Sequence, residues 1–149
     1  MINIPNYKSI NAKTVVFDLN GTLAVDGKVD KETKEALNNL NKKYNIVILT
    51  ADTFGTVIKE FDGYNVSIEI IKNTEEKMNK AKEYMPYIGV GNGNNDIDMF
   101  KNAELGIAVI GKEGCSVKTM LSADIVVNNI MDAINLLSNE KRMIATLRK

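Results

Sequence analysis

The chain has 149 residues, of which 44% are hydrophobic and 26% charged, as in an ordinary globular protein. Its 19 basic and 19 acidic residues balance, so no general positive field is available for nucleic acid or a membrane surface. Histidine is absent and there is one cysteine, which excludes Ser-His-Asp catalysis, histidine-ligated zinc and an internal disulfide. We expect a cytoplasmic protein, because the cysteine usage fits a reducing compartment and no apolar run approaches the ~20 residues of a membrane span.

Strands and helices alternate along the first half of the chain. Residues 1–13 are expected as a leader or an edge strand, and residues 14–18 as a buried strand that ends in Asp18. An Asp-Gly pair between valines predicts a hairpin within residues 20–29. The following elements are a helix over 31–43 capped by Asp30, a strand over 45–49, a helix reaching Phe61, a strand over 65–71, and a helix over 74–84 with a capping box of Asn73 and Glu76.

The second half continues the same alternation. The expected elements are a strand over 87–90, a polar loop over 91–96, a short helix to about residue 102, a strand over 105–110, a helix over 115–122, a strand over 124–128, and helices over 130–137 and 140–148. This order predicts an α/β fold, a three-layer α/β/α sandwich with a Rossmann-like parallel sheet. We expect one domain over 1–149, with its core in 14–138 and a C-terminal helix in 139–149.

Polar residues follow several of the predicted strands at the point where each strand ends. The first such strand ends in Asp18, the second in Thr50, and a later one in a glycine-rich stretch that contains Asn92 and Asp96. Lys77 lies in the first turn of the helix before that later strand. In a doubly wound sheet these ends converge on one crevice. An Asp, a Thr, a Lys and a second Asp in one crevice suit a phosphoryl group with a divalent cation.

Each residue type has a chemical reason to be there. Asp18 can attack phosphorus and carry a phosphoryl group. The Thr50 hydroxyl and the turn amides after it can bind phosphate oxygens, and Lys77 can neutralise charge on the transferring group. Asp18 and Asp96 can hold a hard cation such as Mg²⁺. Gly21 allows the backbone to approach a ligand closely.

The motifs, in this order, resemble those of haloacid dehalogenase-like (HAD-like) phosphotransferases. The matching segments are Asp18-Leu19-Asn20-Gly21-Thr22-Leu23, Thr50-Ala51-Asp52, Lys77 and Gly91-Asn92-Gly93-Asn94-Asn95-Asp96. The C-terminal part resembles the phosphorylation domain of P-type ATPases more closely still, with its strongest match from Gly91 to Val127. The resemblance implies a Mg²⁺-dependent phosphatase or phosphotransferase that acts through an aspartyl phosphate on Asp18. It implies catalytic roles for Asp18, Asn20 and Lys77, phosphate binding by Gly21, Thr50, Ala51 and Lys77, and metal binding by Asp18, the Asn20 carbonyl, Asn92 and Asp96.

Three departures from the family pattern are informative. Asn20 stands where the family's phosphatases carry an acid–base Asp, and an amide cannot trade a proton at neutral pH. We therefore expect slow hydrolysis. Asn92 replaces a metal-binding Asp, so we expect weaker metal affinity. The intervals between the motifs are too short for a folded cap domain, which predicts an open crevice.

Several alternatives remain open at this point. A catalytically weak regulatory or phosphate-binding protein on the same scaffold is the main rival, and a receiver-type signalling domain is a third option that lacks paired acidic residues after the first strand. Lys80 and Lys82 compete with Lys77 for the phosphate-neutralising role, and Thr50 with Asp52 fits a plain helix cap as well. Cys115 is expected as a packed small residue. The expected partner is a phosphorylated small molecule or phosphoprotein, with neither nucleic acid nor membrane, and a second subunit is possible.

Overall fold

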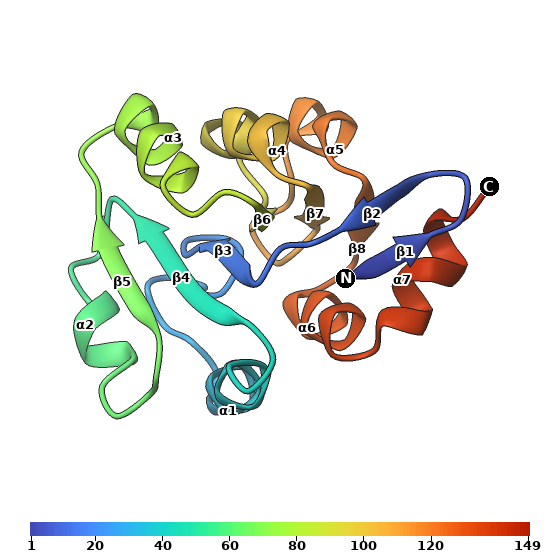
Figure 1. Cartoon of the computed structure of the whole chain (residues 1–149). Coiled ribbons are helices and arrows are strands. Elements are labelled where there is room, and N and C mark those ends of the chain that lie inside the picture. The colour runs from blue at the N-terminus through green and yellow to red at the C-terminus, as the bar shows by residue number, and fades with distance from the viewer.

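A six-stranded parallel sheet forms the centre of the computed structural model, which describes residues 1–149 (Figure 1). Its strands are β3 (Thr14–Asp18), β4 (Asn45–Thr50), β5 (Ser67–Ile70), β6 (Tyr87–Gly91), β7 (Leu105–Val109) and β8 (Ile125–Val127). They lie in the order β5-β4-β3-β6-β7-β8. Every residue of β3, β6 and β7 is buried, as expected for parallel strands covered on both faces.

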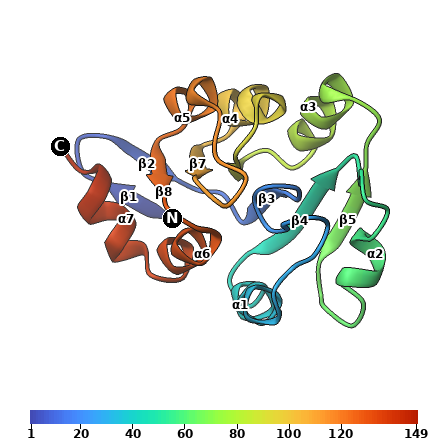
Figure 2. The same ribbon diagram turned by 180° about the vertical axis from the view of Figure 1, so that it is seen from behind.

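Helices cover both faces of the sheet (Figures 1 and 2). One layer contains α3 (Thr74–Lys82), α4 (Ile97–Asn102) and α5 (Val117–Ser122). The other contains α1 (Lys31–Leu40) and α6 (Ile130–Ser138), with α7 (Glu140–Leu147) packed beside α6. The predicted three-layer α/β/α sandwich is therefore confirmed, and none of its helices is long and apolar enough to cross a membrane.

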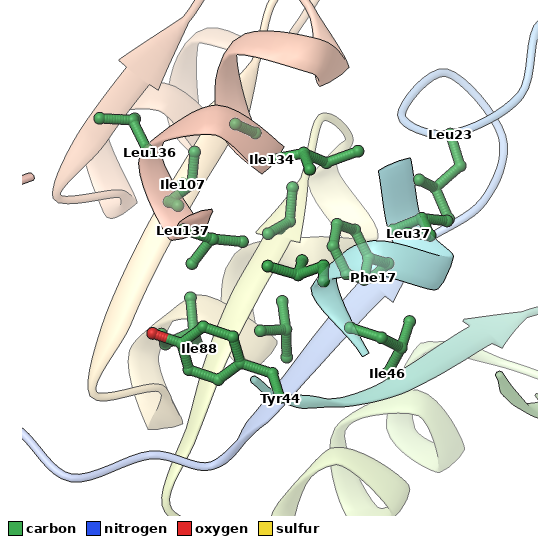
Figure 3. Close-up of a cluster of buried hydrophobic side chains, with 14 of the residues drawn as sticks. Phe17, Leu23, Leu37, Tyr44, Ile46, Ile88, Ile107, Ile134, Leu136 and Leu137 are labelled. Carbon is green, nitrogen blue, oxygen red and sulfur yellow. The ribbon is translucent and has the colours of Figure 1, made fainter. Parts of the chain in front are cut away.

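The core is divided between the two faces of the sheet. Alternate strand residues point in opposite directions, so Phe17 packs on one side and its neighbour Val16 on the other. The larger cluster fills the space between the sheet and the layer of α1 and α6, where Leu37 and Leu137 meet Phe17 and Ile88 (Figure 3). This packing holds β3 and β6 in register, and so sets the relative positions of the residues at their carboxyl ends.

The prediction for residues 1–13 needs correction. They form a separate antiparallel hairpin of β1 (Ile2–Ile4) and β2 (Lys8–Ile10), which does not pair with the main sheet. Its isoleucines are buried against the core near α7, and Tyr7 donates a hydrogen bond to Asp124, the residue before β8. These residues are therefore not an edge strand of the main sheet, because β1 and β2 pair with each other and bury Ile2, Ile4 and Ile10 against the core.

Of two local predictions in the first half, one needs correction and one is confirmed. The helix expected up to Phe61 is a single turn, α2 (Val57–Glu60), because Asp52 Oδ1 accepts hydrogen bonds from the amides of Thr56 and Val57 and holds the preceding residues in a loop. The hairpin at Asp26-Gly27 is confirmed, since both residues have positive φ and the bridge joins Val25 to Lys28. The resulting flap over residues 25–28 lies against the loop that follows β4, where Thr56 Oγ1 donates to the Gly27 carbonyl over 2.7 Å.

Candidate active site

Strand register brings the predicted polar residues to one edge of the sheet. Asp18 is the last residue of β3 and pairs with Leu49, so Thr50 lies one residue further along the neighbouring strand β4. On the other side Phe17 pairs with Val90, which places Asn92 two residues beyond that pair. Because parallel strands share a direction, their carboxyl ends lie together at one edge of the sheet.

A buried triad of charges lies at this edge of the sheet. The Lys77 ammonium, carried on α3, lies 2.7 Å from Asp18 Oδ1 and 2.7 Å from Asp96 Oδ1. The side chains of Asp18, Lys77 and Asp96 are 9%, 1% and 0% exposed. Two carboxylates against one ammonium leave one excess negative charge in a nearly dry site, which is costly unless a further cation compensates it. Lys80 does not reach the triad and instead pairs with surface carboxylates of Glu69 and Glu83.

The electrostatics of the triad follow from this excess of charge. Burial, and after it the nearby Asp96 carboxylate, raise the pKa of Asp18 from 3.8 to about 7, against the lowering effects of the Lys77 ammonium and the Thr22 hydroxyl. Burial by itself lowers the pKa of Lys77, but the two carboxylates outweigh that effect and hold the pKa above its usual range. Lys77 is therefore a permanent cation of the site, whereas Asp18 is a basic carboxylate.

Thr22 has one hydroxyl proton but lies within hydrogen-bonding distance of two acceptor oxygens. Thr22 Oγ1 lies 3.2 Å from Asp18 Oδ2 and 3.1 Å from Asn92 Oδ1, and its single proton can satisfy only one of them. The Asn92 amide cannot turn to help, because its Nδ2 donates to the Gly114 carbonyl over 3.1 Å. Gly21, with φ of +80°, makes room for that amide, since any side chain there would overlap Asn92 Nδ2.

Asp96 holds the loop after β6 in place through hydrogen bonds to its backbone. Its Oδ2 accepts hydrogen bonds of 3.0 Å from the amides of Asn92 and Gly93, which fixes the loop after β6. Gly91 permits this close approach, because a Cβ there would overlap the Asp96 carboxylate. The remaining oxygen, Oδ1, touches Lys77 Nζ without a well-aligned hydrogen bond. Asp96 thus orients both the lysine and the loop.

The loop that follows β7 completes the wall, and sequence reasoning missed it. Ser116 N donates to the Asn92 carbonyl over 2.8 Å, and the buried Thr119 hydroxyl donates to the Gly93 carbonyl over 2.7 Å. Together with the Gly114 carbonyl these groups clamp the loop of residues 91–96. Only the strand ends carry a sequence signal of this convergence, since residues 114–119 have no distinctive local pattern. Thr22 belongs to the quoted motif, but its bridging position could be found only from the structure.

The remaining predicted residues occupy different positions. Thr50 is buried, and its Oγ1 accepts a hydrogen bond of 2.9 Å from Asp52 N at the turn after β4. Ala51 is exposed in the same turn. Asn20 Oδ1 is buried without a hydrogen-bond partner. Asp52 caps the start of α2, as the simpler interpretation predicted, and Cys115 is a half-buried residue packed against the smaller core cluster.

The chemistry of the donor set fits a divalent cation. No group of three or more His, Cys, Asp or Glu side chains is placed to hold a metal ion, and the site has two carboxylates, Asp18 and Asp96. Several oxygens nevertheless lack a full set of hydrogen-bond donors. Asp18 Oδ2 and Asn92 Oδ1 compete for one hydroxyl, and Asn20 Oδ1 is buried without a hydrogen-bond partner. A hard cation accepts such oxygens and also offsets the excess negative charge.

Comparison with known proteins identifies the fold and a family. No family model matches the chain. The uncharacterized protein MJ0073 of Methanocaldococcus jannaschii is 53% identical over 73 residues, which are 49% of this chain and 78% of that protein. A Moraxella catarrhalis 3-deoxy-D-manno-octulosonate 8-phosphate phosphatase, solved with magnesium, phosphate and the sugar acid, superposes with a TM-score of 0.65 at 16% identity, over 93% of this chain and 95% of that one.

Two further solved structures agree. A protein of Streptomyces avermitilis described as a HAD family hydrolase has a TM-score of 0.66 at 18% identity, covering 86% of this chain and 83% of that one. A zinc-transporting PIB-type ATPase has a TM-score of 0.63 at 22% identity, covering 79% of this chain but 20% of the pump. The chain therefore has the haloacid dehalogenase-like fold and belongs to one family with MJ0073.

Proposed function

We propose that the protein is a phosphatase or phosphotransferase that forms an aspartyl phosphate on Asp18 and depends on a divalent cation, Mg²⁺ by preference. The observation that carries this proposal is the buried Asp18 carboxylate, which lies at the end of a central strand in ion-pair contact with Lys77. The likeness in fold to a phosphatase solved with magnesium and phosphate supports it. A carboxylate kept for structure alone would be better placed where water could solvate it.

Asp18 has two distinct oxygens for two tasks. Oδ1 lies against Lys77, on the side from which a phosphoryl group can be neutralised, so Oδ1 attacks phosphorus while the bond to the leaving oxygen breaks. The Thr50 hydroxyl and the Ala51 amide bind the phosphoryl oxygens. The Gly21 amide, predicted from the sequence for the same role, already donates to the Ala24 carbonyl over 2.9 Å and is left out of this set. The leaving oxygen takes its proton from water. Attack of water on the acyl phosphate then releases inorganic phosphate and restores the carboxylate.

The cation has its donors on the other side of Asp18. Asp18 Oδ2, Asn92 Oδ1 and the Asn20 backbone carbonyl would hold it, and Asp96 keeps the loop of Asn92 in place. When bound, the cation supplies positive charge to the phosphoryl oxygens. With Asn92 neutral, this set has one carboxylate fewer than the family pattern, so its affinity is low.

Asn20 sets the expected rate. Its amide cannot protonate a leaving group or activate water, and the loss of general acid–base help typically costs ~10²–10⁴-fold. The protein is therefore slow with alkyl phosphates, and less impaired with acyl or aryl phosphates whose leaving groups need no proton. The open crevice, without a cap domain, admits a phosphorylated small molecule or a phosphoprotein.

A turnover assay with matched variants tests the proposal. Acetyl phosphate and an aryl phosphate are offered with Mg²⁺ to the wild type, Asp18→Asn, Lys77→Met and Lys80→Met. We expect loss of turnover in the first two variants and wild-type rates in Lys80→Met, because Lys80 pairs with surface carboxylates away from Asp18. Turnover that survives Asp18→Asn would refute the covalent mechanism.

A regulatory phosphate-binding protein is the second candidate. The two amides at positions 20 and 92, in a family where carboxylates are usual, are what favours it. It predicts saturable binding of inorganic phosphate with Mg²⁺ and no turnover of acetyl phosphate at any enzyme concentration, so the same assay separates the two.

A further inference from the structure

A cavity lies next to the catalytic loop, apart from the Asp18 nucleophile and the lysine that pairs with it. Its volume is about 210 Å³, and it is bounded by residues 21–25, by the N-termini of α1 and α6, and by the loop after β7. None of Asp18, Thr50 and Lys77 lines it. Gly21 and Thr22 form one wall, so the cavity is adjacent to the loop whose hydroxyl contacts the nucleophile.

The charges around this cavity favour an anion. Lys28 and Lys112 both line it, both are exposed, and neither forms an ion pair. Asp30 is the one acidic residue of the lining. An exposed lysine without a partner is ordinary by itself, but two that converge on one cavity produce a locally positive field.

The N-terminus of α1 adds unsatisfied donors at the same place. This helix has ten residues, and its N-cap residue, Asp30, makes no side-chain hydrogen bond to the first turn. The amides of residues 31–33 therefore have no protein acceptor, in contrast to α6, where Asn129 Oδ1 accepts from Asp132 N over 2.9 Å. Free amides at the positive end of a helix dipole bind anionic oxygens.

A buried hydroxyl gives an independent indication of a ligand. Thr33 lines the cavity and is only 3% exposed, yet its Oγ1 has no oxygen or nitrogen partner. Its hydrogen-bond partner is the Met131 sulfur at 4.0 Å, which is a weak acceptor. Buried hydroxyls in folded proteins are normally hydrogen-bonded, so this donor is available to an occupant of the cavity.

We propose that this cavity is a second binding site, separate from the phosphate site of Asp18, for a phosphate or carboxylate group. Lys28 and Lys112 supply charge, and the free amides of α1 and the Thr33 hydroxyl supply hydrogen bonds. The group belongs either to the far end of a substrate or to a separate small molecule. Binding there requires no turnover by Asp18.

Amide chemical shifts in a titration with inorganic phosphate test the proposal and resolve the two sites. Binding in the cavity shifts the amides of Gly111, Thr33 and Ile130, whereas binding at the catalytic site shifts those of Ala51 and Asp52. We expect saturable shifts of the first group in the low millimolar range. The double variant Lys28→Ala/Lys112→Ala should weaken this binding about tenfold and leave the second group unchanged. Lys118→Ala, an exposed lysine on α5 outside the cavity, is the matched control and should bind as the wild type does.

A second variant separates a binding role from a structural one. Thr33→Val removes the hydroxyl at nearly constant volume. If the hydroxyl donates to a ligand, the variant binds phosphate more weakly in the cavity, while its melting temperature is equal to or above that of the free wild type because an unpaired buried hydroxyl has been removed. Shifts that are absent in the first group, or that have the same midpoint in the wild type and both variants, would overturn the proposal.

The source of the anion is decided with the non-hydrolysing Asp18→Asn protein. Propane-1,3-diol bisphosphate and propyl phosphate are compared as probes. A bisphosphate that shifts both groups of amides with one midpoint, and binds more tightly than the monophosphate, identifies the site as the far end of a substrate pocket. Independent midpoints identify a separate ligand. Turnover does not enter this comparison, so failure of the proposed phosphatase function leaves the result interpretable.

Discussion

Replacing Asp18 with Asn should stabilise the fold when no cation is present. The buried carboxylate has a pKa of about 7 in the folded protein against 3.8 as its usual value, a rise of about three pH units. Each unit corresponds to ~1.4 kcal/mol, so the ionised carboxylate destabilises the folded state by ~4 kcal/mol at neutral pH and above. The amide removes this charge and leaves Lys77 balanced by Asp96 alone. For a chain of this length, the melting temperature should rise by on the order of 10 °C.

The pH dependence gives the sign of the effect. A group whose pKa is raised on folding contributes stability that is present below its unfolded pKa and is lost as the pH rises through the folded value. The advantage of Asp18→Asn should therefore be small near pH 4, grow up to pH 7 and level off above it. Thermal unfolding followed by circular dichroism, in buffer with a chelator, measures both proteins at each pH. A wild type that is equally or more stable at pH 8 would refute the claim that the site carries excess negative charge.

Three further predictions follow from single residues. Asn20→Asp should accelerate hydrolysis of alkyl phosphates by ~10²-fold or more and change the hydrolysis rate of aryl phosphates little, as measured by steady-state kinetics. Equal gains in rate on both substrates would mean that residue 20 is not the missing acid. Asn92→Asp should tighten Mn²⁺ binding in calorimetry or electron paramagnetic resonance, because it adds a charge to the donor set, and unchanged affinity would remove Asn92 from that set. The hydrogen bond to the Asp124 carboxylate raises the pKa of Tyr7 to about 12, so the stability that this bond contributes is present below pH 10 and is lost towards pH 12. Tyr7→Phe should therefore be less stable than the wild type at pH 8 and approach it at pH 12. A difference in stability that does not change with pH would argue against this bond.

The sheet and its layers were predictable because buried parallel strands carry a strong local signal. Each apolar run that ends in Asp18, Thr50 or Gly91 is a strand of the structure, and the alternation with helices implied parallel pairing. The N-terminal hairpin was not predictable in the same way. Its three-residue strands are short, and its anchors, such as Tyr7 on Asp124, join residues over a hundred positions apart.

The candidate site was likewise predictable from the sequence only in part. Residue types at strand ends indicated which side chains converge, and Lys77 could be preferred to Lys80 because it lies in the first turn of its helix. The single proton that Thr22 shares between two oxygens, and the clamp of Ser116 on the loop of Asn92, depend on how separate loops cross. No local pattern in the sequence encodes such a crossing.

Detection of the acyl phosphate tests the central claim most directly. The wild type is mixed with acetyl phosphate and Mg²⁺, quenched in acid and digested, and the peptides are measured by mass spectrometry with and without hydroxylamine. The account predicts one phosphoryl group on the peptide that contains Asp18, labile to hydroxylamine and absent from Asp18→Asn. A phosphoryl group on another residue, or turnover of acetyl phosphate by Asp18→Asn, would contradict it.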